Sequence, residues 1–120
     1  MLPSSDPRIW GPVVWDALFV IACNYPHAAS SDDVLRMCAF LAAMSHQLPC
    51  PVCGAHFRAF MRSRDLRADL ASRDCVVQTL VDSHNDICIK TGGRRLSSSQ
   101  VLRIFSVGKA QNENVGLWLD

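Results

Sequence analysis

Apolar residues along this chain recur with the spacing of an α-helix in several separate stretches. Residues 13–25 are apolar on nearly every side, which predicts a helix that is covered on more than one face. The stretch NYPHAASS interrupts this pattern, and Ser31 then provides an N-cap for a second helix. That helix has one apolar seam with spacings of three and four. The seam consists of Val34, Met37, Leu41, Met44 and Leu48.

Two further long helices are predicted in the second half of the chain. Pro51 suits the first position of a helix over residues 51–62, which leaves Cys50 as its N-cap. Another helix is expected over residues 72–90, and two glycines follow its end. Polar residues step by four along one stripe of this helix, so the rest of its surface is expected to face inward. The inward residues are Val76, Val77, Leu80, Val81, His84, Ile87 and Cys88.

A short helix completes the pattern. Ser97 and Gln100 have the spacing of a capping box, which predicts a helix start in the stretch SSSQVLRIF. No stretch alternates apolar and polar residues in the manner of a strand. The sequence therefore predicts an all-α fold in which residues 1–120 form one domain, a four-helix bundle with a short fifth helix.

Composition argues against several classes of function. The formal net charge is +1, so nucleic acid is not expected as a partner. The longest apolar run, VVWDALFVIAC, is shorter than the roughly 20 residues of a membrane span. The opening MLPSSDPR lacks the apolar middle of a signal peptide, so we expect a cytoplasmic protein. In a reducing compartment, six cysteines indicate metal binding or redox chemistry more than a disulfide framework.

The cysteine pair in LPCPVC has several interpretations. A zinc-binding helical interaction module could use His46, Cys50, Cys53 and His56, which have the spacing H-x3-C-x2-C-x2-H. A helical adaptor with inert cysteines is a second alternative, whereas a purely structural bridge across two residues would constrain the unfolded chain little. Redox chemistry fits the local physics best, because a cysteine at a helix N-cap meets backbone N–H groups and the positive end of the helix dipole.

The two cysteines are expected to face different surroundings. Cys53 lies one turn after Cys50 and shares an apolar face with Phe57, Phe60 and Met61. We therefore expect Cys50 to meet solvent and substrate, and Cys53 to point inward. A thioredoxin-like fold would need strands beside such a helix, and the sequence predicts none. The electron acceptor is therefore expected inside the helical bundle.

Three stretches share a pattern with a known family: WGPVVWDALF followed by NYP (10–26), LPCPVC (48–53) and HNDICIKTGGR (84–94). Their residues, order and spacing resemble the Erv/ALR family of flavin-linked sulfhydryl oxidases, and they cover most of the chain. The short length and the ending VGKAQNENVGLWLD resemble the small members encoded by large DNA viruses.

The resemblance implies a homodimer of helical bundles in which each subunit binds FAD without a Rossmann glycine loop. It implies that Cys50 and Cys53 pass electrons from the dithiol of a protein substrate to FAD and then to O2, giving H2O2. No metal is expected at this site. The implied FAD contacts are Gly11, Trp15, Phe19, His84, Asn85, Ile87, Cys88, Lys90 and Trp118.

The chain departs from the family pattern at three positions of the implied FAD site. Phe19 stands where many members have a histidine, and Cys88 stands at an asparagine of the flavin motif. Gly93 replaces the last lysine of that motif. Phe19 can still pack against the cofactor, but it cannot donate a hydrogen bond.

The remaining cysteines offer no counterpart to the disulfide that ties the fourth helix to the fifth in many members. Cys75 and Cys88 lie in one predicted helix at a separation of roughly 20 Å, beyond disulfide reach. We expect buried thiols at Cys23, Cys38, Cys75 and Cys88, and a Cys23–Cys38 bridge is the open alternative. No cysteine precedes Trp10 or follows residue 103, so a separate thioredoxin-like protein is expected to deliver electrons to Cys50. A viral member would act in the host cytoplasm or the virion.

Overall fold

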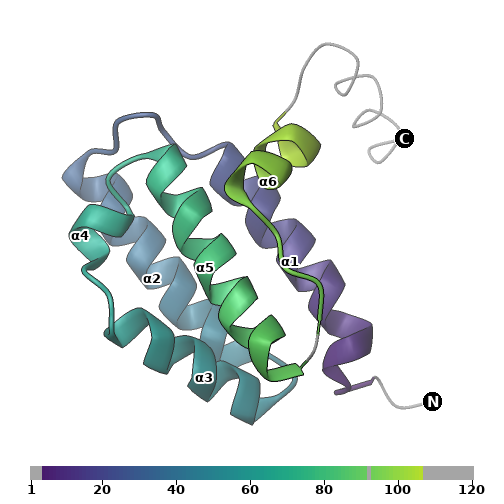
Figure 1. The fold of residues 1–120 in the computed structure, drawn as a ribbon. Coiled ribbons are helices and arrows are strands. Elements are labelled where there is room, and N and C mark those ends of the chain that lie inside the picture. Colours follow the sequence, from purple (N-terminus) through teal and green to yellow (C-terminus); the bar gives the residue numbers. More distant parts are fainter. Residues whose placement is uncertain (1–3, 92, 107–120) are drawn as a thin grey trace, which may run out of the picture.

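A computed structural model describes residues 4–91 and 93–106 of the chain, with the backbone alone at residues 88–91. The described elements are all helices, which confirms the all-α prediction. In Figure 1, α5 runs between α1 and α6 on one side and α2, α3 and α4 on the other. The helices are α1 (Pro7–Cys23), α2 (Ser31–Gln47), α3 (Pro51–Arg62), α4 (Leu66–Asp69), α5 (Arg73–Thr91) and α6 (Ser98–Phe105).

Capping side chains set where the helices begin. Ser97 and Gln100 form the capping box of α6, as predicted. The predicted cap of α2 was wrong by one residue, because Ser30 rather than Ser31 is its N-cap. With Ser30 as the cap, Asp33 closes a capping box: its N–H donates to the Ser30 hydroxyl at 3.1 Å and its carboxylate accepts from the Ser30 N–H at 2.9 Å.

The first helix begins earlier than residue 13, where the prediction started it. The Asp6 carboxylate accepts a hydrogen bond from the Arg8 N–H at 2.9 Å, and Pro7 occupies the first helical position. Pro12 consequently lies inside α1, where it removes one backbone donor near the helix start. The added turns place Trp10 on the helix.

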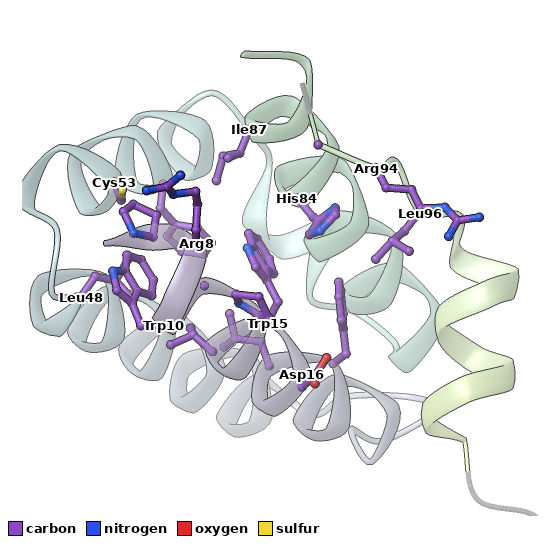
Figure 2. A pocket seen from close by; sticks show the side chains of 18 of the residues that line it. Arg8, Trp10, Trp15, Asp16, Leu48, Cys53, His84, Ile87, Arg94 and Leu96 are labelled. Carbon is purple, nitrogen blue, oxygen red and sulfur yellow. The ribbon is translucent and has the colours of Figure 1, made fainter. Parts of the chain in front are cut away.

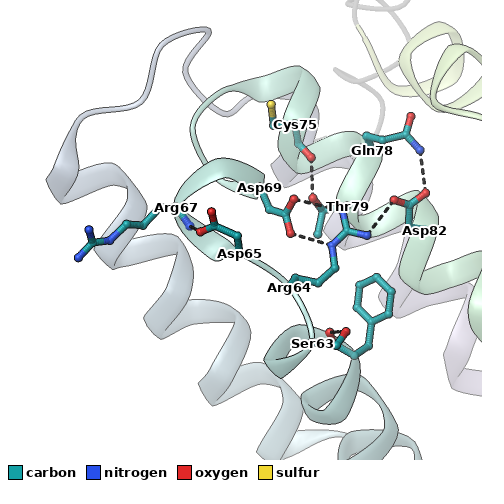
Figure 3. A network of polar contacts seen from close by, with 10 residues as sticks. Ser63, Arg64, Asp65, Arg67, Asp69, Cys75, Gln78, Thr79 and Asp82 are labelled. Atoms are coloured by element: carbon teal, nitrogen blue, oxygen red, sulfur yellow. Dashed lines mark hydrogen bonds and ion pairs between the residues drawn. The ribbon is translucent and has the colours of Figure 1, made fainter.

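A short helix, α4, was not predicted, because four residues show no periodicity. Arg64, just before α4, joins it to its neighbours (Figure 3). The Arg64 guanidinium donates to Asp69 of α4 at 2.8 Å and to Asp82 of α5 at 3.2 Å. The same guanidinium lies 5.3 Å from the ring centre of Phe60 in α3. One arginine thus contacts three helices.

The core lies along α5, which packs against α1, α4 and α6. The buried Tyr25 hydroxyl donates to the Leu70 carbonyl at 2.7 Å and joins the α1–α2 loop to the α4–α5 loop. None of the described helices has the length and apolar character to cross a bilayer. The largest of the almost fully buried apolar side chains are Phe19, Leu70, Val76, Val77, Leu80, Val81 and Val101.

Candidate active site

The cysteine pair stands at the start of α3. Cys50 is the N-cap, with an extended backbone, and Pro51 occupies the first helical position. The Cys50 sulfur accepts a hydrogen bond from the Cys53 N–H at 3.3 Å, and the two sulfurs lie 2.7 Å apart. The start of α3 therefore directs a backbone N–H and the positive end of its dipole at Cys50.

The two sulfurs have opposite electrostatic surroundings. Hydrogen bonds from the Cys53 thiol and the Cys53 backbone N–H lower the pKa of Cys50. Burial first, and then the hydrogen bond and charge of Cys50, raise the pKa of Cys53 from 9.0 to about 11. When the reduced pair loses one proton, the negative charge therefore lies on Cys50 and the remaining proton on Cys53.

Close packing against α2 positions the first turn of α3. A methyl group added at Gly54 would collide with the carbonyl oxygen of Ser45, so the two helices approach this closely only with glycine at that position. The guanidinium of Arg58 donates to the same carbonyl at 3.0 Å. These contacts hold the end of α2 directly beside the cysteine pair.

A cavity of about 710 Å³ opens next to Cys53 (Figure 2). Its walls come from α1, α3, α5 and α6, from the end of α2 and from the segment 93–96. Most wall residues are apolar or aromatic, and the charged ones among them are Arg8, Asp16 and Arg94. Cys53 lies on the wall and Cys50 does not, so one sulfur of the pair borders the cavity.

Aromatic rings form part of the cavity wall. The rings of Trp15 and Phe19 stack with their centres 5.7 Å apart and their planes inclined by 26°. The His84 ring meets Trp15 edge-on, at 5.1 Å between centres. Phe105 of α6 lies 5.7 Å from Phe19 on another side. Such rings can give flat apolar surfaces to a planar ligand.

Most of the side chains predicted to contact a cofactor lie on this wall. Asn85 is not one of the wall residues, and its amide is bonded to the backbone of Leu96. The side chains of Cys88 and Lys90, and all of Trp118, lie outside the described residues. The predicted contacts on the wall are Gly11, Trp15, Phe19, His84 and Ile87. That these residues bind a cofactor stays a prediction.

Several wall residues were not predicted. Trp10 belongs to the turns of α1 that the prediction left out. Leu96 and Phe105 reach the cavity because α6 folds back against α1 and α5, and no local pattern predicts contacts between segments so far apart. A usable signal for Phe105 was the amphipathic pattern of SSSQVLRIF, because an amphipathic helix has to cover apolar surface.

The structure gives the zinc alternative no ligand set. In the part of the chain that the structure describes, no three His, Cys, Asp or Glu side chains group closely enough to hold a metal ion. His46 and His56, the two predicted imidazole ligands, are both exposed. Cys23, Cys38 and Cys75 are free thiols, so the open alternative of a Cys23–Cys38 bridge is not realised. Cys23 is buried as predicted, whereas the prediction was wrong at Cys38 and Cys75, which are only half-buried.

Known proteins share both the sequence pattern and the fold. A probable FAD-linked sulfhydryl oxidase of Acanthamoeba polyphaga mimivirus is 27% identical over 98 residues, which are 81% of this chain and 68% of that protein. The yeast Erv1 core superposes with a TM-score of 0.78 at 22% identity, covering 88% of this chain and 86% of its own. The FAD-binding domain of Saccharomyces cerevisiae Erv1 superposes with a TM-score of 0.76 at 22% identity, covering 83% and 93%.

At these identities the two solved structures establish the fold alone. The family itself follows from a sequence model, that of the Erv1/Alr family, which matches residues 12–106. This match takes in most of the first helix, the cysteine pair and the stretch HNDICIKTGGR, which carried the resemblance. This chain therefore belongs to the Erv1/Alr family.

Proposed function

We propose that this chain is an FAD-linked sulfhydryl oxidase that converts a dithiol and O2 into a disulfide and H2O2. The observation that carries the proposal is the position of Cys53: its thiol is hydrogen-bonded to Cys50 on one side and borders a large apolar cavity on the other. Family membership and the name of the mimiviral relative support the same activity.

The cavity suits a flavin dinucleotide. Its volume of about 710 Å³ lies within the range of roughly 300–1,000 Å³ that is typical of small-molecule sites. Trp15, Phe19 and Ile87 offer apolar surface to a planar ring, and His84 and Arg94 add polar groups. We propose that these wall residues, together with the wall residue Gly11, hold FAD. When bound, FAD takes two electrons from the dithiol and passes them to O2.

The two cysteines divide the thiol chemistry between them. A substrate thiolate attacks the Cys50 sulfur of the Cys50–Cys53 disulfide, which forms a mixed disulfide at Cys50 and releases Cys53 as a thiolate. A second substrate thiolate then attacks the substrate sulfur of the mixed disulfide, and the substrate leaves as a disulfide. Cys50 departs readily in that step, because its lowered pKa makes it a good leaving group. Cys53 is then the sulfur that faces the cofactor.

Colour and oxygen consumption test this proposal. The purified chain should be yellow and should consume O2 when dithiothreitol is added. Cys53→Ser should keep the flavin and lose turnover, whereas Cys75→Ser, at a half-buried thiol away from the cavity, should keep both. A folded, colourless chain that retains no added FAD would overturn the assignment, and a bound metal in its place would favour the zinc module.

We also propose that the chain forms a homodimer through α1. Ile9, Val13 and Val20 recur on one side of this helix and are 63%, 68% and 47% exposed, an apolar stripe of the kind that a symmetric partner covers. Val13→Asp should give a folded monomer in sedimentation velocity, whereas Ala68→Asp on exposed α4 should remain dimeric. A Val13→Asp protein that sediments as the dimer would exclude this face.

The substrate and the place of action are further predictions. We propose a thiol-bearing protein, such as a thioredoxin-like relay, that meets Cys50 directly, because Cys50 lies off the cavity wall and is partly exposed. Action in the cytoplasm, or in a host cytoplasm or virion if the source is a virus, stays a prediction. A Cys53→Ser protein with Cys50 reduced should trap the disulfide form of such a partner, because the Cys50 thiolate attacks that disulfide, forms a mixed disulfide at Cys50 and releases one partner thiolate.

A further inference from the structure

Asn85 ties α5 to the segment that precedes α6 and lines the cavity. Its side-chain amide donates to the Leu96 carbonyl at 2.7 Å, and its oxygen accepts from the Leu96 N–H at 2.9 Å. Leu96 belongs to the irregular segment between α5 and α6, and this segment lines the cavity through Gly93, Arg94 and Leu96. Both polar ends of one side chain are therefore used to hold this segment against α5.

The two bonds to Leu96 also fix which way the amide points. A flipped amide would set its NH2 group against the Leu96 N–H and its oxygen against the Leu96 carbonyl, which would be unfavourable at both ends. The amide oxygen must therefore face the Leu96 N–H. That same oxygen lies 3.3 Å from Nδ1 of His84. Since the oxygen can only accept, the contact is favourable when Nδ1 of His84 carries a proton.

We propose that Asn85 is a positioning residue of the cofactor site. Through one amide it holds the segment that carries Arg94 and Leu96 in place, and it fixes neutral His84 as the Nδ1–H tautomer. His84 lines the cavity and packs edge-on against Trp15, so its protonation pattern is part of what the cavity presents to a ligand. This role rests on the proposed flavin site, and it assigns Asn85 to the support of the wall rather than to the wall itself.

Two substitutions separate the two tasks of the amide. Asn85→Ala removes both bonds to Leu96 and the acceptor near His84. Asn85→Asp keeps an acceptor for the Leu96 N–H and for His84, but its carboxylate cannot donate to the Leu96 carbonyl. Gln78→Ala is the matched control, because it removes an exposed amide of the same helix that bonds to Asp82 at 2.8 Å, away from the cavity.

The first measurement is the affinity for FAD, from titration of the apoprotein. Asn85→Ala should weaken binding by about tenfold or more, the effect expected from the loss of two hydrogen bonds that hold the wall. Asn85→Asp should weaken it as well, and Gln78→Ala should bind as the wild type does. Wild-type affinity in a folded Asn85→Ala protein would overturn the proposal.

The second measurement reads the tautomer directly, from the nitrogen-15 shifts of the His84 ring at a pH where it is neutral. The wild-type apoprotein should carry the proton on Nδ1, and so should Asn85→Asp, whereas Asn85→Ala, which removes the oxygen that faces Nδ1, should carry a smaller fraction of the proton there. A wild-type proton on Nε2 would refute the inference without any variant. This measurement needs no flavin. A chain that binds no FAD would therefore refute the proposed function, while the nitrogen-15 shifts would still test the His84 tautomer.

Discussion

The difference between the two active-site thiols can be measured by alkylation of the reduced chain. Iodoacetamide reacts with thiolates, so its rate at each cysteine follows the fraction ionised. The pKa of Cys50 lies below its ordinary value, because the N–H and S–H of Cys53 point at its sulfur. The pKa of Cys53 is raised to about 11, mainly by burial beside the cavity. At neutral pH Cys50 should therefore react first.

The size of the effect follows from these shifts. A rise from 9.0 to about 11 lowers the thiolate population of Cys53 at neutral pH by about 100-fold relative to an ordinary cysteine. A more basic thiolate is also a stronger nucleophile, and a Brønsted slope of about 0.4–0.5 returns a factor of somewhat under ten. The net rate ratio in favour of Cys50 should be at least about tenfold, before the lowered pKa of Cys50 is counted. As pH rises, the rate at Cys50 should level off first and the rate at Cys53 should keep increasing.

The assay uses apoprotein that is reduced and then freed of reductant under nitrogen, with limiting iodoacetamide and fragment mass spectrometry to locate the label. The same chain in guanidinium is the control, because both cysteines should react at similar rates once the helix is lost. Cys75 gives an internal reference in the folded protein. Equal rates at Cys50 and Cys53 in the folded chain, or faster labelling of Cys53, would refute the electrostatic reasoning.

Three structural contacts give further predictions. Gly54→Ala should push α3 away from the Ser45 carbonyl by about 1 Å. A shift of this size should lower turnover about tenfold to 100-fold while FAD stays bound. An unchanged turnover number would contradict the role of this close approach. Tyr25→Phe should lower the free energy of unfolding by about 1–3 kcal/mol in a urea titration, because it strands the buried Leu70 carbonyl. Arg64→Met should lower the free energy of unfolding by about 1–3 kcal/mol. Arg36→Met removes an exposed ion pair of 3.8 Å and should change the free energy of unfolding by less than about 0.5 kcal/mol. Equal losses in the two variants would argue against a stabilising role of the Arg64 contacts.

Local chemistry made much of the fold predictable from the sequence. The starts of α3 and α6 were predicted correctly, because Cys50–Pro51 and Ser97–Gln100 are cap signals that act within a single turn. The start of α1 was missed, because the apolar run that predicted this helix begins at residue 13, whereas the cap of Asp6 and Pro7 starts the helix earlier. The absence of a periodic pattern in four residues explains why α4 was not predicted.

The cavity could be predicted only in part, for a different physical reason. The apolar surface of α5 was readable from its polar stripe, and it placed His84 and Ile87 toward the interior, where they line the cavity. Phe105 and Leu96 complete the wall through packing between segments that are distant in sequence. The hydrogen bonds of Asn85 to Leu96 depend on where the segment before α6 lies, so the motif did not predict them, and a cofactor contact of Asn85 stays a prediction.

A single helix start gives two neighbouring thiols their different chemistry. The N-cap residue lies just outside the helix and collects its unpaired N–H groups, whereas the residue one turn later belongs to the packed face. Cys50 consequently has the lowered pKa, whereas Cys53 has the raised pKa and borders the cavity. On the far side of the cavity, hydrogen bonds of Asn85 tie α5 to the segment before α6. Since Cys23, Cys38 and Cys75 are free thiols, the described framework does not depend on their oxidation, and a redox change can be confined to the pair at the start of α3.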